Sequence, residues 1–166
     1  MENTFGSGSA GVIRDRLKLR DVVAAQGAGT NSNFARQYGL PGTFAPIADF
    51  KLLETAVAVA REMGVEMPVG NLLSSDTFYD ASASTMQWAK MGVLAVEMEA
   101  AALYMTAAHL GKRALAICSI PDSIVTGEEP SAEERQTTFT TTMTIARATA
   151  TKLDEQRRGT NSAKIL

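Results

Sequence analysis

The chain is poor in cysteine and contains no long apolar run. Its one cysteine, Cys118, lies inside an apolar segment, so neither a disulfide framework nor a cysteine metal site can be built, and we expect a reducing compartment. No apolar run approaches the roughly 20 residues of a membrane helix, and residues 1–10 lack the charged-then-apolar order of a signal peptide. These absences predict a cytoplasmic protein without a membrane partner.

An excess of positive charge is also missing. The 16 Lys and Arg residues are outnumbered by 18 Asp and Glu, and the net charge of −2 argues against a nucleic-acid partner. The 45% hydrophobic and 20% charged residues are ordinary for a globular protein of this length. We therefore expect one domain over residues 1–157, followed by a flexible tail over 158–166.

Apolar segments alternate with helical patterns along the chain. Strands are predicted at 17–25, 65–73, 93–96 and 114–120, and helices at 50–63, 86–91, from Glu97 to a stop at Gly111, and at 131–157. Residues 26–46 are expected to be loop. Pro68 and Gly70 suggest that their strand is at an edge or carries a bulge. This order predicts a layered α/β fold with a mostly parallel sheet.

The strand at 114–120 is apolar throughout, which suits burial on both faces of a sheet, and it ends at Pro121 and Asp122. Open parallel sheets bind ligands at the carboxyl ends of their strands. Residues 131–134 read as a capping box that opens a helix, with Arg135 in its first turns. The Asp122 carboxyl and the Arg135 guanidinium could therefore meet over one pocket. An ordinary surface ion pair is the alternative.

Two other segments offer ligand contacts. The glycine-rich residues 5–11 could wrap an anion with backbone amides, aided by the Ser9 hydroxyl, although a flexible leader is an alternative. Phe78 and Tyr79 could stack on a heterocycle or belong to the core. Glu97 and Glu99 fall in a predicted first helical turn, where the macrodipole favours carboxylates, but they could instead accept sugar hydroxyls.

Five segments of the chain together resemble the bacterial hexameric purine nucleoside phosphorylases, in the family's order and near its spacing. They are residues 8–11, 18–23, 75–79 and 95–101, and Asp122 with 132–139. The resemblance covers nearly the whole chain and implies a three-layer fold with a mixed, mostly parallel sheet.

The resemblance also implies an activity. Members of the family are pentosyltransferases of purine salvage that catalyse reversible phosphorolysis: a purine (deoxy)ribonucleoside and phosphate give the free base and (deoxy)ribose 1-phosphate. Purine nucleoside and phosphate are therefore the expected partners, with no cofactor and no metal. A homo-oligomer, hexameric in the family, is also implied.

The resemblance assigns roles to individual residues. Asp122 would protonate the purine at N7 with help from Arg135, and an acid here is typical of members that accept both 6-amino and 6-oxo purines. The remaining residues would bind the ligands: Phe78 by stacking on the base, Val96, Glu97 and Met98 around base and sugar, Glu99 at the ribose hydroxyls, and Gly8, Ser9 and Gly11 at phosphate.

The sequence also departs from the family. The family's N-terminal strands and its Gly-Asp-Pro-x-Arg phosphate loop have no counterpart, and neither do a histidine and an arginine lent across its dimer interface. Gly6 stands where the family has a second phosphate-binding arginine, and Pro121 replaces a small hydroxyl residue. The chain therefore reads as a C-terminal portion with a replaced leader.

These departures keep other functions open. A nucleoside-binding remnant without catalysis is one, and a nucleosidase that uses water is another. A uridine phosphorylase is a third, although the glutamine and arginine pair that reads uracil is not found. A generic α/β domain with accidental motif matches is the last.

Overall fold

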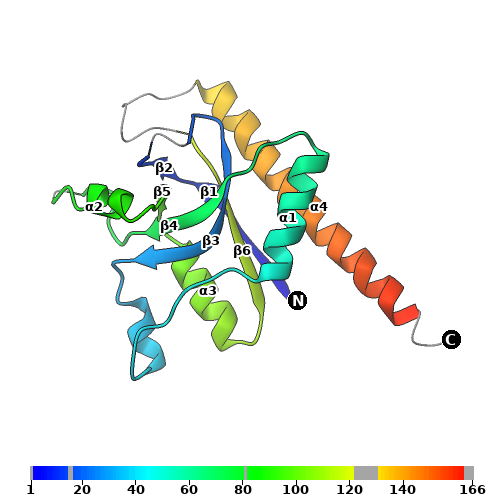
Figure 1. Cartoon of the computed structure of the whole chain (residues 1–166), viewed down its shortest axis with the longest axis horizontal. Helices are drawn as coiled ribbons and strands as arrows, with labels where there is room; N and C mark the ends of the chain where they lie inside the picture. Colours follow the sequence, from blue (N-terminus) through cyan, green and yellow to red (C-terminus); the bar gives the residue numbers. More distant parts are fainter. Residues whose placement is uncertain (1, 15–16, 81, 122–130, 163–166) are drawn as a thin grey trace.

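The protein is described by a computed structural model that places residues 2–14, 17–80, 82–121 and 131–162 (Figure 1). A six-stranded sheet has the order β1-β6-β3-β4-β5-β2. Its strands are β1 (Asn3–Ser9), β2 (Gly11–Val12), β3 (Val22–Thr30), β4 (Val69–Ser74), β5 (Ala95–Glu97) and β6 (Arg113–Ser119). The pairs β1/β6, β3/β4 and β4/β5 are parallel, whereas β3/β6 and β2/β5 are antiparallel. The expected mixed, mostly parallel sheet is confirmed.

Helices cover both faces of this sheet. They are α1 (Phe50–Glu62), α2 (Thr85–Lys90), α3 (Ala100–His109) and α4 (Ala132–Ser162), with a 3₁₀ helix η1 at Phe34–Tyr38. Figure 1 shows α1 and α4 side by side, with α3 on the other side of the strands. The expected three layers are therefore present. Within the described residues, no helix is long and apolar enough to cross a membrane.

Two interior strands, β3 and β6, direct alternate residues into two cores. Val23 and Ala25 of β3 pack with α3, whereas Val22 and Ala24 pack with α1 and α4. The same alternation runs along β6, as the two-residue period of a strand requires. The burial of Ala114 to Ser119 confirms that this apolar run forms a strand covered on both faces.

Helices α1 and α4 are both capped by side chains at their N-termini. Asp49 accepts a hydrogen bond from the Leu52 amide at 2.9 Å and opens α1, and Gly64 follows the helix at a φ of 70°. At α4 the Glu134 amide donates to Ser131 Oγ at 3.3 Å, and the Glu134 carboxylate accepts from the Ser131 amide at 2.9 Å. This reciprocal pair is the expected capping box. The same bond from the Ser131 amide lowers the pKa of Glu134.

Strand β3 differs from its prediction at both ends. It begins at Val22 because the preceding residues form turns, with Arg20 at a φ of 74°. It continues to Thr30, through residues expected to be loop. The sequence did not predict this extension because the small residues there show no apolar strand pattern. A Cβ on Gly29 would lie 2.9 Å from the Trp88 ring, so glycine makes room for this side chain.

Strand β4 lies between β3 and β5, so its expected place at an edge is wrong. Pro68 precedes the strand, and its carbonyl accepts a hydrogen bond from the Ala24 amide at 2.9 Å. A Cβ on Gly70 would lie 2.5 Å from Leu94 Cδ1, so this glycine is explained by close packing. The register irregularity of the pair falls on β3, between Ala25 and Gly27.

Three further boundaries correct the sequence-based expectations. The glycine-rich segment is strand β1, paired with β6 from Asn3 to Ser9, so the flexible-leader interpretation is wrong. Helix α3 begins at Ala100 because Glu97 still pairs with Ser74 in the sheet. Helix α4 reaches Ser162, so the tail expected at 158–166 is wrong for 158–162, and 163–166 lie outside the described residues. Each residue added to a formed helix gains a backbone hydrogen bond, which favours such extension.

Candidate functional site

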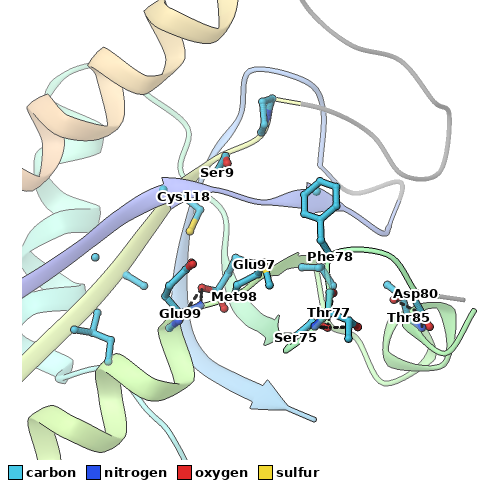
Figure 2. Close-up of a pocket in the computed structure, with 18 of the residues that line it drawn as sticks. Ser9, Ser75, Thr77, Phe78, Asp80, Thr85, Glu97, Met98, Glu99 and Cys118 are labelled. Atoms are coloured by element: carbon cyan, nitrogen blue, oxygen red, sulfur yellow. Dashed lines mark hydrogen bonds between the residues drawn. The ribbon is translucent and has the colours of Figure 1, made fainter. Parts of the chain in front are cut away.

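A pocket of about 1320 Å³ opens where β1, β5 and β6 end. It is lined by the β1–β2 corner, the loop after β4, the start of α2 and residues 96–100. Among the sequence-predicted site residues, those that line it are Gly8, Ser9, Gly11, Phe78, Val96, Glu97, Met98 and Glu99. Pro121 also lines it, whereas Asp122 and the Arg135 side chain lie outside the described part of the chain. Figure 2 shows Ser9 and Cys118 above Glu97, Met98 and Glu99 in this view. Phe78 lies on the opposite side of the view from Glu99.

Strand β1 and the β1–β2 corner present glycine backbone and two serines, Ser7 and Ser9, to the pocket. A Cβ on Gly6 would lie 2.9 Å from Leu103 Cδ2, whereas one on Gly8 would meet nothing within 4 Å. The Ala10 amide is already bonded to the Ser119 carbonyl at 2.9 Å, so it is not free for an anion. The Ser9 side chain is exposed, and its hydroxyl makes no hydrogen bond to any described residue.

The pocket has acids but no cation among its described lining residues. Asp80, Glu97 and Glu99 line it, and no Lys, Arg or His does so within the placed part of the chain. A phosphate bound by these residues alone would depend on neutral donors. Such hydrogen bonds are roughly half as strong as charge-assisted ones.

Glu97 is a buried structural acid at the end of β5. Its Oε2 accepts hydrogen bonds from the Glu99 amide at 2.8 Å and the Ala100 amide at 2.7 Å, and Ser74 Oγ donates to Oε1. Ser74 Oγ also accepts from the Ala101 amide at 2.8 Å. Burial raises the pKa of Glu97, and these hydrogen bonds oppose the rise. Glu97 therefore caps α3 from a strand, not from the expected first helical turn.

Glu99 has a different environment. It is the N-cap residue of α3, but its side chain makes no capping hydrogen bond and is exposed at the pocket. Capping by its carboxylate therefore does not explain this acid. Its two oxygens remain available to accept hydroxyl groups from a ligand.

The aromatic pair after β4 is exposed. Phe78 and Tyr79 are 78% and 86% exposed, and their rings form an edge-to-face pair with centroids 5.1 Å apart. The core interpretation of this pair is therefore wrong. Figure 2 shows the Phe78 side chain projecting away from Ser75 and Thr77. A planar ligand could stack on such a ring.

Comparison with known proteins identifies the family of this chain. A sequence model of the phosphorylase superfamily matches residues 3–156. The chain belongs to the phosphorylase superfamily. Because the match begins at residue 3, the glycine-rich strand β1 is part of the superfamily fold.

Three curated relatives share the name DeoD-type purine nucleoside phosphorylase. The protein from Listeria welshimeri is 47% identical over 152 residues, which are 92% of this chain and 65% of that protein. The Clostridium novyi protein is 46% identical over 147 residues, or 88% of this chain and 63% of its own. The Geobacillus sp. protein is 44% identical over 146 residues, or 88% and 62%. The chain thus spans slightly less than two thirds of these relatives' length.

Sequence reasoning missed three polar residues that lie in or next to the pocket. Ser75, which follows β4, lines the pocket. The buried Ser74 at the end of β4 and Asn31 after β3 donate hydrogen bonds to the lining residues Glu97 and Ser75, respectively. The sequence signal for such residues is a polar side chain at the carboxyl end of a strand. For Asn31 this signal could not be used, because the glycines of β3 hid where that strand ends.

Cys118 also lines the pocket, but as an inert group. Burial raises the pKa of its thiol to about 12, so the thiol stays protonated near neutral pH. Among the described residues, no group of three His, Cys, Asp or Glu side chains could hold a metal ion.

Proposed function

We propose that the pocket binds a purine nucleoside and phosphate and catalyses reversible phosphorolysis to the free base and (deoxy)ribose 1-phosphate. One observation carries this proposal: the exposed Phe78 ring, the exposed Glu99 carboxylate and the Ser9 hydroxyl line the same pocket. The name shared by the three curated relatives supports the same activity.

The residues take distinct roles in this proposal. Phe78 stacks on the purine, Val96 and Met98 line base and sugar, and Glu99 accepts the ribose hydroxyls. Glu97 supports Glu99 from below by fixing its backbone amide. Ser9, with the backbone of Gly8 and Gly11, contributes neutral donors to phosphate.

The chemical step needs a proton and a nucleophile. Asp122 donates the proton to purine N7, assisted by Arg135, and the base then leaves as phosphate forms its bond to the sugar carbon. This requires a carboxyl that stays protonated until transfer. The proposal includes no cofactor and no metal. It places the protein in the cytoplasm as a homo-oligomer.

A second candidate is nucleoside binding without turnover. It is favoured by the absence of a cationic side chain among the described residues that line the pocket. Phosphate is doubly charged at neutral pH, and its desolvation must be offset by strong donors.

The two candidates are separated by assays of the purified 166-residue chain. Calorimetric titration with inosine measures nucleoside binding, and release of hypoxanthine is followed with and without phosphate. Phosphate-dependent release supports phosphorolysis, whereas binding without release supports the second candidate. Release that does not require phosphate would indicate a nucleosidase, and no binding of inosine would contradict both candidates.

A further inference from the structure

The described residues of the loop that carries Phe78 form no helix or strand, yet hydrogen bonds fasten this loop at both ends. It runs from the end of β4 at Ser74 to the start of α2 at Thr85. The exposed rings of Phe78 and Tyr79 lie between these ends. Their position must therefore be set by the residues that hold the loop on either side.

The first end is held by Asn31, the residue that follows β3. Strands β3 and β4 are parallel with Thr30 opposite Ser74, so Asn31 reaches the turn after β4. Asn31 Oδ1 accepts a hydrogen bond from the Asp76 amide at 3.0 Å, and its Nδ2 donates to Ser75 Oγ at 3.3 Å. One side chain thus contacts the turn at two points.

Ser75 is in turn hydrogen-bonded to the backbone of Thr77. Its Oγ donates to the Thr77 carbonyl at 2.9 Å and accepts from the Thr77 amide at 3.2 Å. The Ser75 amide is itself bonded to the Glu97 carbonyl at 2.8 Å. The backbone is therefore fixed up to the residue before Phe78.

The second end is held by Asp80. Its carboxylate accepts hydrogen bonds from the Thr85 amide at 2.6 Å, from Thr85 Oγ1 at 2.7 Å and from Ser82 Oγ at 2.6 Å. Figure 2 shows this second attachment next to Thr85, separate from the Ser75–Thr77 attachment. Phe78 and Tyr79 thus span two anchored points.

We propose that Asn31 is a positioning residue for base recognition: it holds the turn at Ser75–Thr77 so that the Phe78 ring is already in place to stack on a purine, with Asp80 holding the far end. The physical reason is preorganisation, because ordering a loop at the moment of binding lowers affinity. This inference rests on the proposed function, since it takes the ligand to be a purine.

The first test measures the loop without any ligand. Backbone order parameters of residues 76–78 are measured by NMR in the parent chain and in Asn31→Ala. We expect values near the rigid limit of about 0.85 in the parent and a fall towards about 0.6 in the variant. Unchanged values in Asn31→Ala would overturn the proposal.

Asn33→Ala is the matched control. Asn33 is exposed, lies two residues after Asn31 in the segment between β3 and η1, and its side chain makes no capping hydrogen bond to η1. Its replacement should leave the order parameters and the melting temperature near those of the parent chain. A fall in Asn33→Ala equal to that in Asn31→Ala would assign the effect to the loop as a whole and overturn the role of Asn31.

The second test measures purine binding by calorimetric titration with hypoxanthine. Stacking on an aromatic ring is commonly worth about tenfold or more in affinity, so Phe78→Ala should weaken binding by that much. Asn31→Ala should weaken it by roughly three- to tenfold, and by nothing further in the Phe78→Ala background, because it acts through this ring. Asn33→Ala should bind like the parent chain.

The outcomes separate this inference from the proposed function. Unchanged affinity in Asn31→Ala, or independent losses that add in the double variant, would overturn the positioning role alone. A parent chain that binds neither hypoxanthine nor inosine would overturn the proposed function, and with it the assignment of Asn31 to purine recognition.

Discussion

The two sides of the pocket are built differently. On the β4–β5–α3 side, Ser74 and Glu97 form a buried hydrogen-bonded cluster beneath the exposed Glu99, and the Phe78 loop is fastened at both ends. On the β1–β2 side, the pocket meets glycine backbone and the serines Ser7 and Ser9, with no cation among the described lining residues. A fold can present neutral ligand groups with its own backbone and short side chains, whereas a doubly charged ligand also needs dedicated cations.

The largest expected effect is on turnover. The 166-residue chain should bind inosine but convert it slowly, well below the ordinary enzyme range of about 1–10³ s⁻¹, because the described residues that we propose for phosphate binding offer only neutral donors. Phosphate-dependent release of hypoxanthine measures this rate, after a cooperative melt has shown that the chain is folded. Turnover inside the ordinary range would mean that other residues supply the phosphate site.

The next effect concerns the buried hydrogen-bonded cluster of Ser74 and Glu97 next to Glu99. Glu97→Ala leaves the amides of Glu99 and Ala100 without their hydrogen-bond acceptor. Each buried donor left without an acceptor lowers the free energy of unfolding by about 1–3 kcal/mol. Glu97→Gln retains an acceptor and should cost much less. Urea denaturation of both variants measures the difference, and equal small losses would show that the cluster is dispensable.

A third test compares two ligands at Glu99. Glu99→Gln should weaken inosine binding more than hypoxanthine binding, because only the nucleoside offers hydroxyls to this carboxylate. If the acid served only the helix macrodipole, the change would instead cost about 0.3–1 kcal/mol of stability and affect both ligands alike. Calorimetric titration with the two ligands decides between these outcomes.

The proposed binding of phosphate near β1 can be tested by adding a positive charge to this strand. Gly6→Arg places a cation on a pocket-lining strand, and the side chain that its Cβ would approach at 2.9 Å is the flexible end of Leu103. Phosphate affinity should rise several-fold relative to Gly6→Gln, a shorter polar side chain that carries no charge. Equal phosphate affinities of the two variants, both still folded, would argue that this strand does not face the phosphate.

The smallest expected effect is a pH dependence at Asp80. Hydrogen bonds from Ser82 and then Thr85 lower the pKa of Asp80 below its usual 3.8, so the ionised form favours the folded chain. This contribution is present above the pKa of the unfolded chain and is lost as pH falls through the lowered value. The melting temperature should therefore fall less steeply below about pH 4 in Asp80→Asn than in the parent. Asp76→Asn, a nearby exposed acid, is the control and should follow the parent.

Parts of the fold and of the site could be predicted because their sequence signals are local. The continuous apolar run of β6, the Asp49 cap and the Ser131–Glu134 capping box each follow from a few adjacent residues, and the structure has all of them. The resemblance of short segments also predicted which residues would gather at one pocket, and the described ones do so. The proton-donor pair was predicted as well, but Asp122 and the Arg135 side chain lie outside the described residues.

The sequence by itself determined the layered α/β class, the capped helices and the family of the chain, because apolar period, caps and motifs are properties of neighbouring residues. Only the tertiary structure decided that Gly29 belongs to a strand and that the strand containing Gly70 is an interior one. The reason for each glycine is a distant side chain, Trp88 for Gly29 and Leu94 for Gly70. It also decided that Glu97 is buried and structural while Glu99 is exposed. Two acids of the same helix start look alike in sequence, and the sheet pairing of Glu97 with Ser74 separates them.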